Sequence, residues 1–150
     1  MSEPVALRAV GIARGWVGTP YCHQASCRGV GCDCLGLVRG VWRTLYGAEP
    51  EPVPAYGVHW AESGGAERLR VALGVYLQPR APGQAAAGDV LLFRLFRRGP
   101  ARHLGIQTEL GTGRAFGRFV HAQAGQGVCE VALTEPWQRR LVGRFAFPQH

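Results

Sequence analysis

Cys34 is the residue whose sequence neighbourhood best suits nucleophilic chemistry. It follows Asp33, a residue type that caps helices, and it precedes apolar residues at helical spacing, such as Leu35 and Val38. A thiol in the first turn of a helix meets the positive end of the helix dipole and several unpaired N–H groups. We therefore expect a lowered thiol pKa and a place for an oxyanion. Its position alone also allows a buried structural thiol.

A nucleophilic cysteine needs a base, and two of the five histidines lie in strand-like segments. His103 opens the segment 103–110, and His121 lies inside the segment 118–123. On neighbouring antiparallel strands one imidazole can take the thiol proton while the other holds it in the required tautomer. Either histidine taken alone could equally be a core or surface residue.

The elements that must position these residues predict an α+β domain spanning residues 1–150. Apolar spacing predicts helices over about 4–16, 34–46 and 60–74, with Gly47 ending the second. From residue 88 onward the pattern changes to short apolar or alternating strands, at 88–96, 103–110, 118–123, 127–133 and 141–148. Helices followed by strands favour an antiparallel sheet over a doubly wound parallel one.

Composition excludes several classes of protein. Apolar residues make up 47% of the chain and charged residues 18%, which excludes a disordered chain. No apolar run approaches the length of a membrane span, and the first ten residues do not resemble a secretory signal. All 17 basic residues are arginine and the net charge is +7, which indicates an anionic partner or a coding bias. A nucleic-acid-binding module is disfavoured, because no basic helix or alternation of aromatic and basic residues accompanies the charge.

Four cysteines crowd into one segment and raise the alternative of a metal site. Cys22, Cys27, Cys32 and Cys34 are spaced C-x4-C-x4-C-x-C, an imperfect match both to the usual zinc spacing and to that of iron–sulfur proteins. A Cys22–Cys27 disulfide would need an oxidising compartment. Small packing residues in a glycine-rich loop are the simplest interpretation, and we expect neither metal nor cofactor.

Five short motifs extend over most of the chain. They are GTPY (18–21), DCLG (33–36), GDVLLF (88–93), HLGI (103–106) and FVHA (119–122). Together and in this order they resemble the motifs of the NlpC-type cell-wall cysteine peptidases, which are papain-like enzymes. The resemblance implies N-terminal helices packed on a five- or six-stranded antiparallel sheet.

The resemblance also implies roles for individual residues. Cys34 matches the nucleophile, His103 the base and His121 the polar residue that orients the base. Tyr21 matches a tyrosine placed near the thiol and the oxyanion site. Asp33 matches the acid before the cysteine, to which we assign the capping role. There are departures: Leu35 stands where many relatives have serine, and the 18 residues from His103 to His121 exceed the usual gap.

The function implied by the resemblance is hydrolysis of peptidoglycan stem peptides, at the bond between D-glutamate and diaminopimelate. The sequence DCLGL is similar to the branch found in phage tails and gene-transfer-agent particles. We therefore expect synthesis in the cytoplasm, assembly with tail or baseplate hub proteins, and action in the periplasm of a target cell. The alternatives are a structural tail adaptor or metal-binding subunit without hydrolysis, and another acyl-transfer reaction of the papain-like group, such as amidase or acyltransferase.

Overall fold

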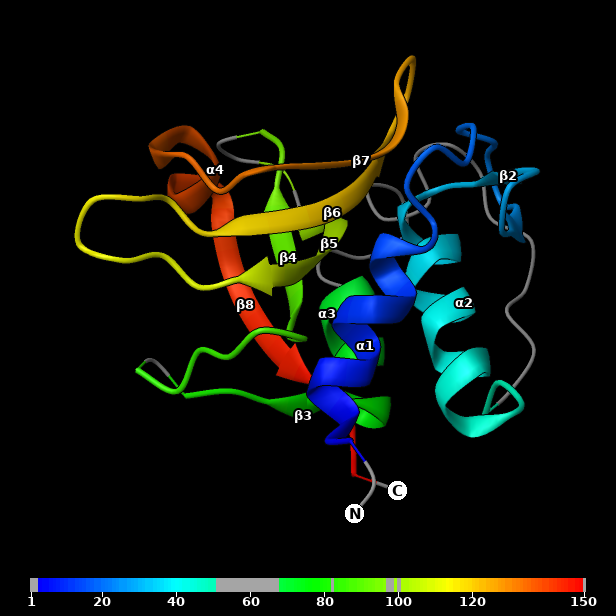
Figure 1. Ribbon diagram of the computed structural model, residues 1–150, viewed down its shortest axis with the longest axis horizontal. Coiled ribbons are helices and arrows are strands. Elements are labelled where there is room, and N and C mark those ends of the chain that lie inside the picture. Colours follow the sequence, from blue (N-terminus) through cyan, green and yellow to red (C-terminus); the bar gives the residue numbers. More distant parts are fainter. Residues whose placement is uncertain (1–2, 51–67, 82, 97–98, 100, 150) are drawn as a thin grey trace.

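The computed structural model describes residues 3–50, 68–81, 83–96, 99 and 101–149, and has helices gathered beside a sheet (Figure 1). The helices are α1 (Val5–Arg14), α2 (Cys34–Tyr46), α3 (Arg68–Tyr76) and α4 (Glu135–Arg140). The strands are β1 (Ser26–Cys27), β2 (Gly31–Cys32), β3 (Gln78–Pro79), β4 (Val90–Arg94), β5 (Ala101–Glu109), β6 (Arg118–Gln123), β7 (Gly127–Ala132) and β8 (Leu141–Ala146).

Six of the described strands form one antiparallel sheet in the order β3-β8-β4-β5-β6-β7, and β1 and β2 form a separate small hairpin. Neighbours in this sheet are joined mostly by short connections, as hairpin topology requires. The predicted α+β class and the predicted antiparallel sheet are confirmed, with six strands.

Both faces of the sheet are covered. Along β4, Val90 and Leu92 lie in the large core with α1 and α2, whereas Leu91 and Phe93 lie in a second core that includes Trp137 of α4. The burial of both faces explains why β4 is a continuous apolar run rather than an alternating one. The site described below takes residues from both layers, since Cys34 packs against the first core and Trp137 against the second.

The helix predicted over 34–46 has the same ends in the structure, because both ends carry their own signals. Asp33 accepts a hydrogen bond from the backbone N–H of Gly36, and Gly47 adopts φ 93°, where a side chain would be strained. The first helix is shorter than predicted and ends at Arg14. Of the helix predicted over 60–74, residues 60–67 lie outside the described residues and 68–74 belong to α3, which continues to Tyr76.

Several short elements were not predicted. The two-residue strands β1, β2 and β3 and the six-residue helix α4 are too short to show a hydrophobic period. The hairpin of β1 and β2 is tied to α2, since the Ser26 hydroxyl donates to the Gly36 carbonyl and Arg43 donates to the Ser26 carbonyl. It thereby holds the loop before Cys34 against the start of α2.

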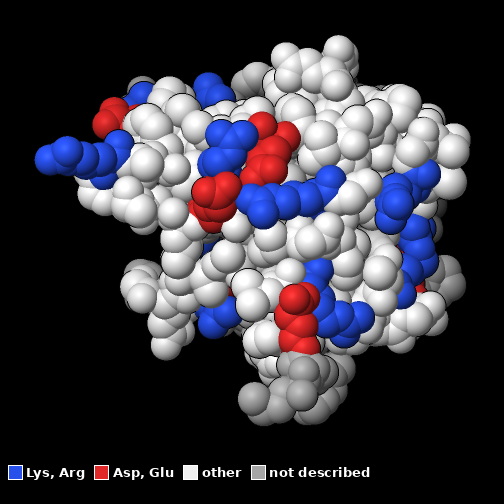
Figure 2. All heavy atoms as spheres, in the orientation of Figure 1, with Lys and Arg blue, Asp and Glu red and all other residues white. Residues whose placement is uncertain are grey.

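Surface charge is spread out rather than gathered. In Figure 2, arginines form separate patches scattered over the visible face, and acidic side chains lie beside several of them. Arg14, for example, pairs with both Glu109 and Glu130 at 3.0 Å. On this face the described arginines do not form the continuous basic stripe that nucleic-acid binding would use. Among the described residues no helix has the length and apolar character needed to cross a membrane.

The packing of α1 on α2 predicts opposite effects for two glycine-to-alanine substitutions. A Cβ at Gly40 would lie 2.1 Å from the buried ring of Trp16, so Gly40→Ala is expected to lower the free energy of unfolding by about 1–3 kcal/mol or more. Gly11, in the middle of α1, has nothing within 4 Å of its Cβ position, so Gly11→Ala is expected to add about 0.5–1 kcal/mol. Urea unfolding of both variants measures the difference. A Gly40→Ala protein as stable as the parent would contradict this packing.

Candidate active site

A cavity of about 370 Å³ opens at the start of α2 and contains most of the residues singled out by the sequence. Its lining includes Tyr21, Asp33, Cys34, Arg102, His103 and Trp137. It therefore joins the loop before α2, the first turn of α2, strand β5 and helix α4 in one place.

Asp33 fixes the position of Cys34 by binding backbone on two segments. Its side chain is 3% exposed; one carboxylate oxygen accepts from Gly36 N at 2.7 Å and the other from Gln24 N at 2.8 Å. The first bond caps α2, which confirms the predicted capping role. The second bond, not foreseen from the sequence, fastens the preceding loop to the same helix end.

The half-buried thiol of Cys34 lies against strand β5 on both sides of His103. It donates to the carbonyl of Arg102, with 3.8 Å between sulfur and oxygen, and it is in hydrogen-bond contact with the backbone N–H of Leu104. The pairing of β5 with β6 runs from Glu109 only as far as Ile106, so this part of β5 has its β6-facing side open to the thiol. Because the pairing of β5 with β6 stops here, the Cys34 side chain of α2 can contact the backbone of β5.

The predicted fall in the pKa of Cys34 is wrong for the resting site. Burial is the main cause that raises the thiol pKa to about 11, and the adjacent Asp33 carboxylate adds to the rise. The N–H groups of Leu35 and Leu104 favour the thiolate but are outweighed. Position at a helix start is visible in the sequence, whereas desolvation by the surrounding layers is not.

The structure brings His103 and His121 into direct contact. His103 Nε2 lies 2.8 Å from His121 Nδ1, and the two rings meet edge to face at 83°. Burial lowers the pKa of His103 to about 3, helped by His121 and Arg102, and burial lowers the pKa of His121 to about 4. Both rings are therefore neutral near pH 7, so one nitrogen of the pair donates and the other accepts.

Trp137 of α4 covers both imidazoles and was not singled out in the sequence. Its ring stacks on His103 at 5.6 Å between centroids and 27°, and meets His121 edge-on at 5.2 Å. This apolar cover helps to explain why both histidine pKa values fall. The only sequence signal for this contact is the presence of a tryptophan in the short segment between two predicted strands.

Gly105 allows the histidine-bearing strands to approach. A Cβ there would lie 2.7 Å from the Phe119 ring, which itself packs on His121 at 4.7 Å between centroids. Phe119 and His121 share a face, as their alternation in the sequence predicted.

Tyr21 lines the cavity and forms a β-bridge with Cys32, two residues before Cys34. Burial and the neighbouring Cys34 and Asp33 raise the pKa of its hydroxyl, so the Tyr21 side chain is a neutral hydrogen-bonding group in the site. Its predicted role at the oxyanion site stays a prediction. His23, also in the lining, lies 3.8 Å from Asp33.

The clustered cysteines are free thiols in the structure, as is Cys129. Within the ranges that the structure describes, no three His, Cys, Asp or Glu side chains are grouped to hold a metal ion. Cys32 is buried, which raises its pKa to about 12 and suits a packing role.

Comparison with known proteins gives matches at the level of structure. No family model matches the sequence, and no curated protein matches it significantly. A Staphylococcus aureus protein described as similar to lipoprotein, NLP/P60 family, superposes on all of this chain with TM-score 0.63 and 20% identity. NlpC2 from Trichomonas vaginalis superposes on 98% with TM-score 0.63 and 16% identity. The chain has the NlpC/P60 fold.

The extent of the match differs between these proteins. This chain spans 43% of the Staphylococcus protein and 48% of the Trichomonas protein. By contrast, it spans 98% of the NlpC/p60 domain of the peptidoglycan hydrolase SagA, which covers 95% of this chain with TM-score 0.58 and 23% identity. The NlpC/P60 fold thus accounts for nearly the whole chain, in agreement with the predicted papain-like class.

Proposed function

We propose that this chain is a cysteine peptidase that hydrolyses peptidoglycan stem peptides, with Cys34 as nucleophile, His103 as base and His121 as the residue that orients the base. One observation carries the proposal. The Cys34 thiol contacts the backbone on both sides of His103 in a shared cavity, while His103 Nε2 is held by His121. This arrangement supports a nucleophile beside a base that a third group orients, as cysteine peptidases require.

The contact between the imidazoles assigns the tautomers. Because Nε2 of His103 faces His121, Nδ1 is the nitrogen left to receive the thiol proton, and it must carry a lone pair. His103 then bears its hydrogen on Nε2 and donates it to His121 Nδ1. His121 can accept only while neutral, and its lowered pKa of about 4 keeps it so near pH 7.

The reaction follows from these positions. The Cys34 sulfur attacks the scissile carbonyl carbon as its proton passes to His103 Nδ1, and the imidazolium then protonates the departing amine. A thioester remains on Cys34. Water attacks the thioester, gives a proton to His103, and the thiol leaves by recovering that proton. The residue-35 N–H and the Tyr21 hydroxyl are the donors we assign to the oxyanion.

The resting state is a neutral pair rather than a preformed ion pair. The pKa of Cys34 is raised to about 11 and that of His103 is lowered to about 3, which favours a proton on sulfur in the resting site. Proton transfer accordingly accompanies the attack. This differs from cysteine enzymes whose thiolate forms in advance.

Support for the substrate comes from the NlpC/P60 fold, which this chain shares with a domain whose name describes a peptidoglycan hydrolase. The bond that we propose is the one between D-glutamate and diaminopimelate. The resemblance of DCLGL at 33–37 to tail-borne members supports delivery to the periplasm by a phage-like tail, together with hub proteins.

Digestion of purified sacculi tests the function and identifies the bond. Wild type is expected to release muropeptides with new D-glutamate carboxyl and diaminopimelate amino ends, as determined by mass analysis. Cys34→Ala is expected to release none above background, because the acyl group has no acceptor. If the wild type is folded and releases nothing, the chain is an adaptor rather than a hydrolase. If both proteins release the same fragments, Cys34 is not the nucleophile.

A further inference from the structure

Arg102 interrupts the regular pairing of β5 directly before the proposed base. On β4, Phe93 pairs with His103 and the next residue, Arg94, pairs with Ala101, so Arg102 is an extra residue on β5. Such a bulge turns side chains out of the ordinary alternation and occurs often beside active sites. Here it places the Arg102 carbonyl at the Cys34 sulfur, and Arg102 lines the same cavity.

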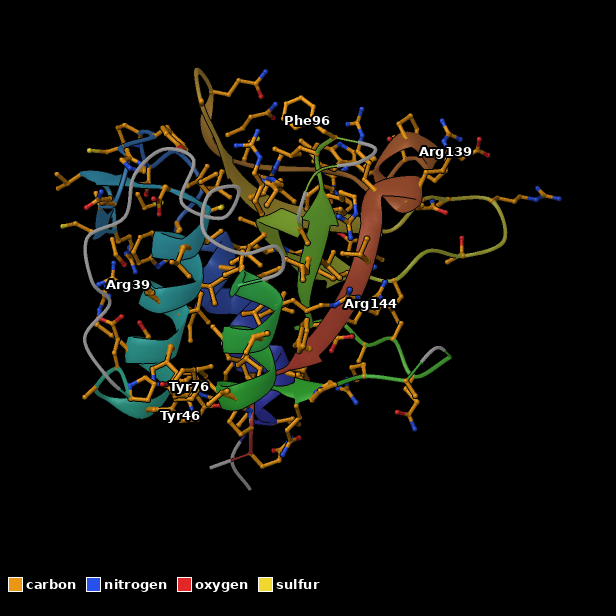
Figure 3. The ribbon with its side chains drawn as sticks, turned by 180° about the vertical axis from the view of Figure 1, so that it is seen from behind. Arg39, Tyr46, Tyr76, Phe96, Arg139 and Arg144 are labelled. Atoms are coloured by element: carbon orange, nitrogen blue, oxygen red, sulfur yellow. The ribbon has the colours of Figure 1, made fainter. Side chains whose placement is uncertain are left out.

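The guanidinium is held in place rather than trailing into solvent. It lies 5.0 Å above the centre of the Phe96 ring, and its Nε atom is shielded from water. Phe96 follows the end of β4, at the same end of the sheet as α4 (Figure 3). The positive charge of Arg102 acts on groups in the cavity: it contributes to lowering the pKa of His103, and it opposes the rise in the pKa of Tyr21.

Asp33 and Arg102 both line the cavity. The two oxygens of Asp33 accept from the backbone N–H groups of Gly36 and Gln24 and close the end of α2. Among the described lining residues Arg102 is the one arginine. Arg102 is therefore the source of positive charge in the described lining of the cavity.

A guanidinium fixed beside a nucleophile matches a planar anion on the substrate. Arginine binds carboxylates by two parallel N–H···O bonds, and these bonds strengthen where water is excluded. A D-glutamate linked through its side chain keeps its α-carboxylate free, a few bonds from the carbonyl that is attacked. We propose that Arg102 forms a carboxylate-binding subsite that selects acyl donors carrying such a free carboxylate; this rests on the proposed function.

The test uses two synthetic peptides that differ in one group. Both contain L-alanyl-γ-D-glutamyl-diaminopimelate; one keeps the free α-carboxylate of glutamate and the other has it converted to the carboxamide. Wild type is expected to cleave the carboxylate peptide with a kcat/KM higher by about tenfold to a hundredfold. Arg102→Gln is expected to slow cleavage of that peptide, chiefly through KM, and to slow cleavage of the carboxamide peptide much less. Its preference should fall to within about threefold.

Controls separate the subsite from folding and from charge in general. Arg114→Gln removes the same charge from the exposed loop between β5 and β6 and is expected to leave the preference intact. Arg102→Lys keeps the positive charge but lacks the two parallel N–H donors of arginine, so its preference for the carboxylate peptide is expected to be intermediate. This variant tests the subsite if Arg102→Gln does not fold. Equal cleavage of both peptides by wild type overturns the subsite alone. Cleavage of neither peptide overturns the proposed function, and the subsite with it.

Discussion

His103→Ala is expected to lower kcat for stem-peptide cleavage by about a hundredfold to ten-thousandfold, because the thiol then has no base to receive its proton. The raised pKa of Cys34, about 11, makes this dependence strong, since little thiolate forms without the base. His121→Ala is expected to cost less, while His121→Asn should recover part of the loss by offering an amide oxygen to His103 Nε2. Initial rates on a synthetic stem peptide measure all three.

His23 provides the matched comparison for that experiment. It also lines the cavity and lies 3.8 Å from Asp33, so it is the other imidazole that could be imagined as a base. His23→Ala is expected to keep kcat within about tenfold of wild type, as its removal leaves the proton path intact. The opposite pattern, with His103→Ala active and His23→Ala inactive, would transfer the role of base to His23.

Acidification is expected to destabilise the protein steeply between pH 6.5 and pH 5. In the folded state the pKa of His103 is about 3 and that of His121 about 4, while both titrate near 6.5 when unfolded. As the pH falls through this window, the number of extra protons bound by the unfolded chain rises from about one to about two. Each histidine therefore lowers the free energy of unfolding by up to about 1.4 kcal/mol per pH unit as the pH falls.

Urea unfolding at several pH values measures this slope. The window lies above the range in which Glu49 and Glu130, whose pKa values are lowered by arginines, take up protons. His121→Asn is expected to reduce the slope by about half, whatever its effect on stability at pH 7, because one of the two proton-binding differences is removed. An unchanged slope in a variant lacking both histidines would show that they are not buried as neutral groups.

These two expectations come from one physical fact, the exclusion of water from the histidine pair. Trp137 stacks on His103, Phe119 packs on His121, and the two imidazoles satisfy one another. The same exclusion strengthens the hydrogen bond between them and raises the cost of charging either ring in the resting state. Catalytic orientation and acid sensitivity are thus coupled, since both depend on the layer formed by α4.

Much of the scaffold could be predicted because its signals are local. The ends of α2 follow from Asp33 and Gly47, each of which acts within a few residues. β6 was predicted with the ends it has, from apolar residues between turn residues. The order Cys34, His103, His121 then indicated which side chains would be partners.

Contacts between residues distant in the sequence were decided only in the folded chain. Trp137 stacks on His103 although it lies 34 positions further along the chain, in a six-residue helix too short to show a hydrophobic period. The contact of Cys34 with the open side of β5 depends on where the pairing of β5 with β6 stops. The pKa of Cys34 is the clearest case: helix position, read from the sequence, predicts a fall, whereas burial between two layers raises it. Residue types and local order determine which groups can react, but desolvation is a property of the packed interior, and it sets their charge.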